Sequence, residues 1–324
     1  MVDVARIAGV SLKTVSRVIN DESGVSDATV AKVLAAAAAL RYERNDLAAS
    51  LRQGDRSNTL GLVIEDVGNP FYSVIAQAVE QGARERHCLL ITASAREDPA
   101  RERELVTALL RRRVDALLIV PAGPDHRYLE DAGFVSRTVF LDRPPARTRA
   151  DTVLIDNAPG ARRAVEHLIA HGHERIAFVG DDRRLYTARE RLAGYQRALA
   201  GAGIAPDPRL VVVGNSTSAA AAEAVSELMG MSAPVRPTAI FAGNNRCTVG
   251  ALQALGARRR RVALVGFDDF ELADLLAVSV VRTDPHRLGQ LGVELAFARM
   301  DGDVRRAQRL VVPTELVPRG SGEL

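Results

Sequence analysis

Short apolar runs alternate with segments of helix length along most of this chain, and the alternation occurs twice. The first series of runs comprises Leu60–Ile64, Leu89–Thr92, Ala116–Val120, Thr138–Leu141 and Val153–Ile155. The second series comprises Ile176–Val179, Arg209–Val213, Ala239–Ala242 and Val262–Val265. Helix-length segments separate the runs at Tyr72–Arg86, Ala100–Arg112, Pro159–Ala170, Ala188–Ala202, Ala219–Met229 and Cys247–Leu255. Such runs are typical of parallel strands buried on both faces, so the sequence predicts two doubly wound α/β lobes.

Polar residues follow several of these strands. They lie at Asp66 to Tyr72, Pro121, Asp142-Arg143, Gly180 onward, Gly243-Asn244-Asn245 and Gly266-Phe267-Asp268-Asp269. Ligands of open α/β sheets bind outside the carboxyl ends of the strands, so two facing lobes predict a cleft. Carboxylate, amide and guanidinium groups are suited to vicinal hydroxyls. The alternative is that each loop residue is solvated or caps the next helix.

Before residue 57 the pattern is helical. Apolar residues recur at helical spacing on both sides of Gly9, which predicts two short helices joined by a tight turn. Ser11 stands where it caps the second helix, and Gly9 permits the positive φ of a sharp turn. A third helix begins at Ser26. Its predicted apolar stripe consists of Val30, Val33, Leu34, Ala37 and Ala38.

Three short helices with a tight turn between the first two match the helix-turn-helix plan, in which the second helix enters the major groove of DNA. Four residues of that helix fall outside its apolar stripe, namely Leu12, Lys13, Ser16 and Arg17. A guanidinium pairs with guanine, an apolar side chain packs on a thymine methyl, and hydroxyls such as that of Thr14 bind phosphates. Spacing alone fits equally well a small helical domain with a solvated polar face.

Bulk charge does not decide between these two interpretations. The formal net charge of the 324-residue chain is only +3, so any DNA contact must come from the placement of side chains. Two cysteines, Cys88 and Cys247, are too few for a disulfide framework and wrongly spaced for zinc. Neither a membrane span nor a secretory signal is apparent, so we expect a cytoplasmic protein.

The chain lacks the motifs of the common enzyme classes. It has no nucleophile elbow, Walker motif, dinucleotide fingerprint or His-Glu-x-x-His zinc pattern, so we expect neither enzymatic activity nor a cofactor. His171-Gly172-His173 follows a predicted helix, where a helix stop and cationic groups are favoured, and we expect no metal there. An enzyme on these lobes would need a site without a recognised motif.

The first segment carries a run of specific motifs. They are Asp3-Val4-Ala5, Ala8-Gly9-Val10-Ser11, Thr14-Val15-Ser16-Arg17-Val18-Ile19-Asn20, Val25-Ser26, Leu40-Arg41-Tyr42, Asn45 and Ala48-Ala49-Ser50-Leu51-Arg52. These motifs closely resemble the DNA-binding headpiece of the LacI/GalR family of bacterial transcription regulators. The resemblance implies that Leu12, Lys13 and Arg17 read the operator, while Thr14, Ser16, Asn20 and Ser26 position the DNA backbone. It also implies a DNA-contacting hinge helix with Asn45, Ala48 and Leu51, in which Leu51 wedges into the minor groove.

Three departures from the family pattern stand out. Only Met1 and Val2 precede the Asp-Val-Ala motif, where the family usually has several residues and often a hydroxyl cap. Val30 stands where the family commonly has Arg. In the hinge, Arg44 replaces a usual Pro and Ala49 a usual Arg. These changes imply weaker phosphate contacts.

The remainder resembles the effector-binding core of the same family. The matching motifs are Asn69-Pro70-Phe71-Tyr72, Asp142-Arg143, Gly172 to Gly180, Arg189-Glu190-Arg191-Leu192-Ala193-Gly194-Tyr195 and Val265-Gly266-Phe267-Asp268-Asp269. The resemblance implies a core of the periplasmic-binding-protein type I, with three crossovers between lobes. It implies that Asp142, Arg191, Asn244 and Asp268 bond a ligand, with Phe71 packing on it and Arg189 assisting. Asn245 replaces a common Asp, and Ser216 lies near a position that is often aromatic.

We therefore expect an α/β protein in which a small all-α helix-turn-helix domain precedes two doubly wound parallel-sheet lobes. The headpiece would span residues 1–44, the hinge and linker 45–56, and the effector-binding and dimerisation domain 57–324. Within that domain, the N-lobe would comprise about 57–155 and 286–308, and the C-lobe about 156–285 and 309–318. The tail has no leucine heptads, which predicts no tail-mediated tetramer.

The function that follows is a sequence-specific transcriptional regulator, acting as a repressor. A homodimer would bind an approximately palindromic operator in double-stranded DNA. A small hydroxylated effector, such as a sugar or related metabolite, would control it from the cleft, either as inducer or as co-repressor. Two alternatives stay open. One is a cytoplasmic sugar-binding protein whose headpiece no longer engages DNA, and the other is a sugar- or nucleoside-metabolising enzyme.

Overall fold

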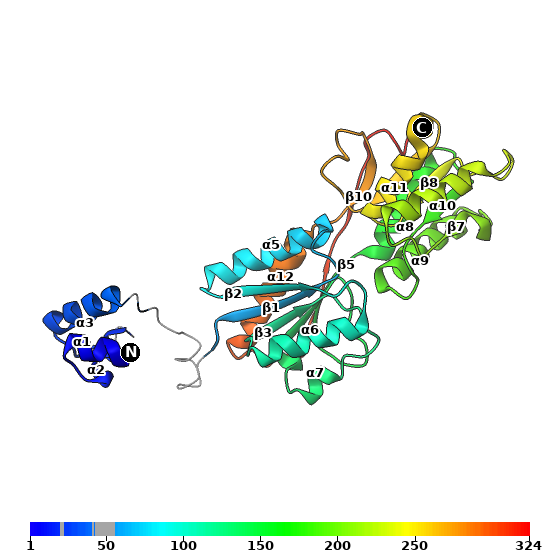
Figure 1. The fold of residues 1–324 in the computed structure, drawn as a ribbon. Helices are drawn as coiled ribbons and strands as arrows, with labels where there is room; N and C mark the ends of the chain where they lie inside the picture. Colours follow the sequence, from blue (N-terminus) through cyan, green and yellow to red (C-terminus); the bar gives the residue numbers. More distant parts are fainter. Residues whose placement is uncertain (20–22, 41, 43–55) are drawn as a thin grey trace. The chain divides into compact units, whose positions relative to one another are not determined.

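The computed structural model describes residues 1–19, 23–40, 42 and 56–324. The chain divides into two compact units, residues 1–57 and 58–324. No helix in the described ranges has both the length and the apolar character that a membrane crossing requires. Figure 1 shows the fold of both units.

Unit one is a bundle of three short helices, α1 (Val2–Ala8), α2 (Leu12–Ile19) and α3 (Asp27–Ala39). Gly9 ends α1 with φ of 65°, the left-handed conformation that the predicted turn requires. The Thr14 N–H donates to Ser11 Oγ at 3.1 Å, so Ser11 caps α2 as expected. The helical turn predicted from the sequence is therefore confirmed.

The core of this bundle lies between all three helices. Its buried members are Val4, Val15, Val18, Val33, Ala36 and Ala37. The stripe expected on α3 was wrong at two positions, because Leu34 and Ala38 are exposed. Leu34 follows Val33 and so lies about 100° further round the helix, away from the buried positions.

Unit two contains two six-stranded sheets, each with helices on both faces. The first sheet has the order β11-β5-β4-β3-β1-β2, and all its pairings are parallel. Its strands are β1 (Thr59–Ile64), β2 (Leu89–Ser94), β3 (Ala116–Ile119), β4 (Thr138–Leu141), β5 (Asp151–Ile155) and β11 (Arg309–Val312). Its helices are α5 (Pro70–Glu85), α6 (Pro99–Arg111), α7 (Tyr128–Asp131) and α12 (Pro285–Met300). We call this sheet and its helices the N-lobe.

The second sheet has the order β12-β10-β9-β8-β6-β7, in which only β12 runs antiparallel to its neighbour. Its strands are β6 (Ile176–Val179), β7 (Val211–Val212), β8 (Ala239–Ala242), β9 (Ala263–Phe267), β10 (Ser279–Arg282) and β12 (Glu315–Val317). Its helices are α8 (Asn157–Ala170), α9 (Tyr186–Gly201), α10 (Ser218–Gly230) and α11 (Asn245–Leu255). We call this sheet and its helices the C-lobe. The predicted α/β class with two doubly wound lobes is confirmed.

Helices cover each sheet in pairs. In the N-lobe, α5 packs against α12 on one face and α6 contacts β1 from the other (Figure 1). In the C-lobe, α8 packs against α9, and α10 against α11. Close helix contact depends on small residues, since a Cβ on Gly194 of α9 would lie 2.3 Å from the Ala158 carbonyl oxygen of α8. Strand residues such as those of β3 and β8 are therefore buried on both faces.

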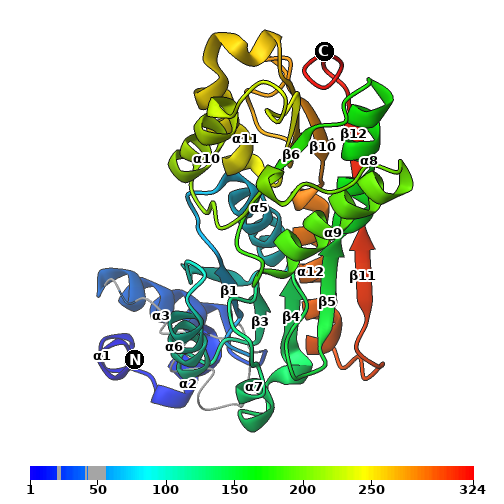
Figure 2. The same ribbon diagram turned by 90° about the vertical axis from the view of Figure 1, so that its right-hand side faces the viewer.

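The chain passes between the lobes three times, after β5, after β10 and after β11. The expected lobe boundary at residue 309 differs from the structure, because β11 pairs in parallel with β5 and so belongs to the N-lobe (Figure 2). Leu310 and Val312 pack their apolar side chains at the edge of that sheet. This packing favours the pairing of β11 with β5 over an earlier crossing of the chain to the C-lobe. The third crossover consequently lies between Val312 and β12.

Candidate functional site

A cavity lies at the carboxyl ends of both parallel sheets, where the N-lobe and C-lobe face each other. Its volume is about 50 Å³, which is room for a few water molecules at about 10 to 15 Å³ each. Side chains from both lobes line it. The lining residues are Glu65, Asn69, Phe71, Tyr72, Glu97, Asp142, Arg143, Phe178, Asp181, Thr187, Ala188, Arg191, Gly243, Asn244, Asn245, Arg246 and Asp268.

The N-lobe wall is built around Asp142 and Arg143, which follow β4. Tyr72 donates to Asp142 Oδ2 at 3.2 Å, and Arg143 grips Glu97 with two bonds of 2.6 Å each. Asp142 Oδ1 is buried and accepts no hydrogen bond from the described part of the chain. Burial raises the pKa of Asp142, and the nearby Arg143 and Arg191 guanidiniums oppose that rise. This oxygen is therefore an acceptor available to a hydroxyl in the cleft.

The C-lobe wall is built around Arg191 and Asp268. Arg191 donates to Asn157 Oδ1 at 2.7 Å, to the Gly243 carbonyl oxygen at 2.7 Å and to Asp268 Oδ2 at 3.3 Å. Its guanidinium also lies 3.8 Å from the centre of the Phe267 ring. Thr283 fixes the other carboxylate oxygen of Asp268 at 3.2 Å. The Arg191 side chain is thus held rigidly at the cavity wall.

Asp142 and Asp268 share an uncommon backbone conformation. Both directly follow a strand, and their φ angles are 64° and 68°. Non-glycine residues in this left-handed region are strained and cluster at functional sites. One such carboxylate from each lobe therefore lines the cavity.

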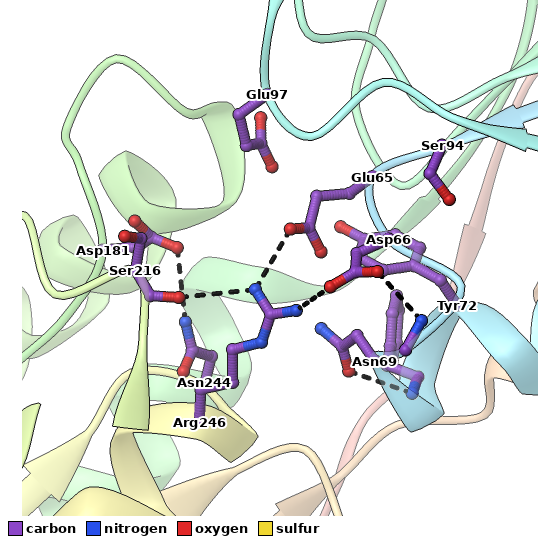
Figure 3. A network of polar contacts seen from close by, with 12 residues as sticks. Glu65, Asp66, Asn69, Tyr72, Ser94, Glu97, Asp181, Ser216, Asn244 and Arg246 are labelled. Atoms are coloured by element: carbon purple, nitrogen blue, oxygen red, sulfur yellow. Dashed lines mark hydrogen bonds and ion pairs between the residues drawn. The ribbon is translucent and has the colours of Figure 1, made fainter. Parts of the chain in front are cut away.

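A third arginine, Arg246, joins the two lobes (Figure 3). It lies in the first turn of α11 and donates to Glu65 Oε1 at 3.0 Å and to Asp66 Oδ2 at 2.7 Å, both beyond the end of β1. Asn245 adds a second bridge, because its amide nitrogen lies 2.9 Å from Asn69 Oδ1. Neither bridge was foreseen from the sequence.

Carboxylates outnumber guanidiniums in the cavity lining, five to three. Burial raises the pKa of Glu65 and of Asp181, because a carboxylate loses hydration there. The Asn244 amide approaches Asp181 Oδ2 at 3.5 Å. The surplus of negative charge disfavours anionic ligands and favours neutral groups rich in hydrogen-bond donors.

Five of the six residues predicted to bind the effector line this cavity, namely Phe71, Asp142, Arg191, Asn244 and Asp268. Arg189 does not, since it is exposed and its guanidinium lies 5.7 Å from the Tyr186 ring centre. Residues two apart on a helix point about 200° apart, so Arg191 faces the cavity and Arg189 faces away. Asn244 Oδ1 is occupied in capping α11, where it accepts the Cys247 N–H at 2.8 Å.

The predicted DNA-contacting residues of α2 lie on its outer face. Leu12 and Lys13 are exposed, and Thr14, Ser16 and Arg17 are half-buried, whereas Val15 and Val18 face the core. Some of these side chains make local bonds: Arg17 donates to the Ser23 carbonyl oxygen, Thr14 bonds Ser11, and Ser26 bonds Thr29. The predicted contacts Asn20, Asn45, Ala48 and Leu51 lie outside the described residues.

The histidines after α8 serve the fold. His171 bonds the His167 carbonyl oxygen, and His173 bonds Thr238 and the Leu324 carbonyl oxygen. No group of three potential metal ligands occurs among the residues that the structure describes.

Family models match both units of the chain. Residues 1–45 match the model of bacterial regulatory proteins of the lacI family, and residues 165–322 match that of a periplasmic binding protein-like domain. The ribose operon repressor of Escherichia coli K12 is 34% identical over 330 residues, covering 99% of both chains. The regulator DegA of Bacillus subtilis is 31% identical over 98% of this chain and 96% of its own.

Solved structures show the same architecture. The lac repressor dimer bound to operator and the anti-inducer ONPF superposes with a TM-score of 0.85 at 27% identity, over 99% of this chain and 98% of the other. The complex of the transcriptional regulator CelR with cellobiose gives a TM-score of 0.73 at 31% identity, over 98% of both chains. These similarities extend over the helical bundle as well as over the two lobes.

Proposed function

This chain belongs to the lacI family of bacterial regulatory proteins and is a DNA-binding transcriptional regulator, and we propose that it is a repressor whose hold on its operator is set by an effector in the cleft. One observation carries the proposal: residues from both lobes line a single cavity at the carboxyl ends of both sheets. An effector there touches both lobes and so couples its own binding to their closure. Such coupling is typically worth about 1 to 3 kcal/mol and acts in both directions.

The effector that best fits this cavity is small, uncharged and rich in hydroxyls. Asp142 and Asp268 offer acceptors, Arg191 and the amide nitrogen of Asn244 offer donors, and Phe71 offers an apolar face. The surplus of carboxylates argues against a phosphorylated or carboxylated metabolite. The names of two relatives, a ribose operon repressor and a regulator solved with cellobiose, agree with a sugar.

The operator is read by α2, with Leu12, Lys13 and Arg17 toward the bases. Thr14 and Ser16 of α2, and Ser26 before α3, face phosphates. The exposure of Leu12 and Lys13 supports this role. The remaining proposed contacts are Asn20 and the hinge residues Asn45, Ala48 and Leu51. Two headpieces are needed for a palindromic site, so the protein acts as a homodimer, as the lac repressor does in its operator complex.

The protein works in the cytoplasm, where its operator lies, and it returns the effector unchanged. No catalytic step is needed for regulation, and the titratable groups of the cavity are engaged in ion pairs and hydrogen bonds such as Arg143 with Glu97 and Arg191 with Asp268. The absence of turnover is checked by following each stabilising sugar by NMR during incubation with the protein.

The test has two arms. A thermal-shift screen of neutral sugars and nucleosides identifies ligands, because a specific ligand raises the apparent Tm by mass action. Electrophoretic titration of genomic fragments against competitor DNA, at fixed salt, then measures specific binding. Specific retention that changes with a stabilising sugar supports the regulator. A sugar response without specific DNA binding would instead indicate a sugar-binding protein with a silent headpiece.

A further inference from the structure

Arg246 occupies a position that is costly for a cation unless carboxylates face it. It lies in the first turn of α11, at the end of the helix that carries partial positive charge. Its guanidinium reaches out of the C-lobe to Glu65 and Asp66 of the N-lobe, at 3.0 and 2.7 Å, and also donates to the Ser216 carbonyl oxygen at 3.3 Å (Figure 3). The two N-lobe carboxylates thus offset the unfavourable placement only when the lobes are close together.

The charged form of Glu65 is in turn stabilised by Arg246. The side chain of Glu65 is only 11% exposed, and burial raises its pKa, an effect that Arg246 opposes and that neighbouring Glu97 and Asp66 reinforce. Asp181 brings another carboxylate to the cavity from the C-lobe. Closing the cleft therefore gathers like charges, and Arg246 supplies the positive charge between the lobes.

The other two arginines of the cavity do not have this role. Arg143 grips Glu97 within the N-lobe, and Arg191 pairs with Asp268 within the C-lobe. Among the hydrogen bonds and ion pairs of the described lining residues, two bridges join opposite walls of the cavity. One runs from Arg246 to Glu65 and Asp66, and the other from Asn245 to Asn69. The cavity left inside, about 50 Å³, is several times smaller than a typical ligand pocket.

We propose that Arg246 is a positioning residue that latches the lobes together before an effector arrives, so that an effector enters only when Arg246 leaves Glu65 and Asp66. The inference rests on the proposed function, because it assumes that the cleft is the effector site. In the latched form the carboxylates Glu65 and Asp66 are occupied by Arg246, and the effector is excluded. The apparent affinity for the effector is therefore the intrinsic affinity multiplied by the fraction of molecules that are unlatched.

The latch is tested without any effector or DNA, by double electron–electron resonance between one nitroxide label on each lobe. Arg111→Cys on α6 and Glu227→Cys on α10 place labels at exposed positions, in a Cys88→Ser background. Cys247 stays unlabelled because it is buried and burial raises the pKa of its thiol to about 12. Diluting the labelled chain with unlabelled protein restricts the signal to distances within one chain.

We expect one narrow distance distribution for the latched protein and a second, more widely separated population in Arg246→Gln. The ratio of open to closed molecules should rise about fivefold or more, and Arg246→Lys should show a smaller rise. The matched control is Arg282→Gln, which removes an ion pair of 2.6 Å to Glu315 inside the C-lobe and should leave the distribution unchanged.

A distribution for Arg246→Gln that matches both the parent and Arg282→Gln would overturn the latch. If thermal unfolding shows that Arg246→Gln does not fold, Glu65→Gln combined with Asp66→Asn removes the same bridge from the other side and must open the lobes. Operator and sugar binding are measured separately, so the latch can fail while the proposed regulator stands.

Discussion

The guanidinium of Arg191 donates to the carboxylate of Asp268 at 3.3 Å, so that a helix and a strand end of the C-lobe present one charge pair to the cavity. Two further bonds, to Asn157 Oδ1 and the Gly243 carbonyl oxygen, use the planar geometry of the same group. Both members of the pair are buried. The wall of the proposed effector site is therefore also part of the folding core.

Arg191→Lys should lower the free energy of unfolding by about 1 to 3 kcal/mol. A lysine ammonium cannot reach all three acceptors from one plane, and buried acceptors are then left unpaired. Urea unfolding of the full chain measures the change. Arg189→Lys is the control, two positions earlier on α9 and exposed, and should be nearly neutral; equal losses in the two variants would contradict the assigned orientation of α9.

Gly194→Ala should destabilise the C-lobe by about 1 to 3 kcal/mol through overpacking. The added Cβ would meet the Ala158 carbonyl oxygen at 2.3 Å and the Ala161 Cβ at 2.8 Å, at the contact between α8 and α9. Thermal unfolding reads the effect as a lower Tm. Gly201→Ala, in the same helix but with open space around the new atom, should leave the Tm unchanged or raise it; a fall as large as that of Gly194→Ala would argue against tight packing as the cause.

Glu102→Gln should cost about 1 to 3 kcal/mol of stability at pH 7. The buried Glu102 carboxylate faces His126 Nε2 at 3.2 Å and accepts from the Ala122 N–H at 2.5 Å and Tyr128 Oη at 2.9 Å. Burial alone would raise the pKa of Glu102, but the neighbouring His126 imidazole and the hydrogen bonds from Ala122 and Tyr128 bring it below its usual value.

The sign of the pH dependence follows from that lowered pKa. The charged form of Glu102 stabilises the fold above the pKa of an unfolded glutamate, about 4.3, and this contribution is lost as the pH falls through the lower folded pKa. The difference in unfolding free energy between the parent and Glu102→Gln should shrink as the pH falls from 7 toward 3. Glu104→Gln, exposed on the same helix, should change the unfolding free energy little at pH 7 or at pH 3. A difference between the parent and Glu102→Gln that grows as the pH falls would contradict the role of Glu102.

Arg17→Ala and Lys13→Ala should both weaken operator binding without unfolding the headpiece. A bidentate arginine contact to guanine is worth about 1 to 3 kcal/mol of discrimination, so Arg17→Ala should relax base preference. Lys13→Ala should weaken binding and reduce its dependence on salt, because the variant loses one cation at the DNA surface. Anisotropy titrations across salt concentrations measure both effects. Arg6→Ala on α1, exposed and paired with Asp3, is the control and should bind like the parent.

Pattern alone predicted most of the architecture because the strands β1 to β9 lie in short runs between helices. It missed β10, β11 and β12. Strand β10 is largely buried but has only four residues, of which Ser279 and Arg282 are polar. Strands β11 and β12 at sheet edges are only partly buried, so their sequences mix polar and apolar residues. The assignment of β11 to the N-lobe depends on a pairing with β5 that lies more than a hundred residues earlier in the chain.

The lining of the proposed effector site was predicted in outline for a similar reason. Asp142, Asp268 and Asn244 follow strands directly, so their location at the cavity follows from sheet topology. Arg189 was predicted with these residues because the motif places it beside Arg191, but it does not line the cavity. Only helix geometry separates the two arginines. The bridge from Arg246 to Glu65 and Asp66 joins residues from different lobes. A local sequence pattern does not predict a contact between residues so far apart in the chain.

The most direct measurement is an anisotropy titration of the full chain against the duplex that it enriches from a genomic library, at fixed salt, with and without the sugar that raises its Tm most. We predict two chains bound per duplex with symmetric half-sites, affinity well above that for competitor DNA, and a change of about 5- to 150-fold on adding the sugar. A monomer that binds every duplex equally, whether or not sugar is present, would contradict the regulator proposed here.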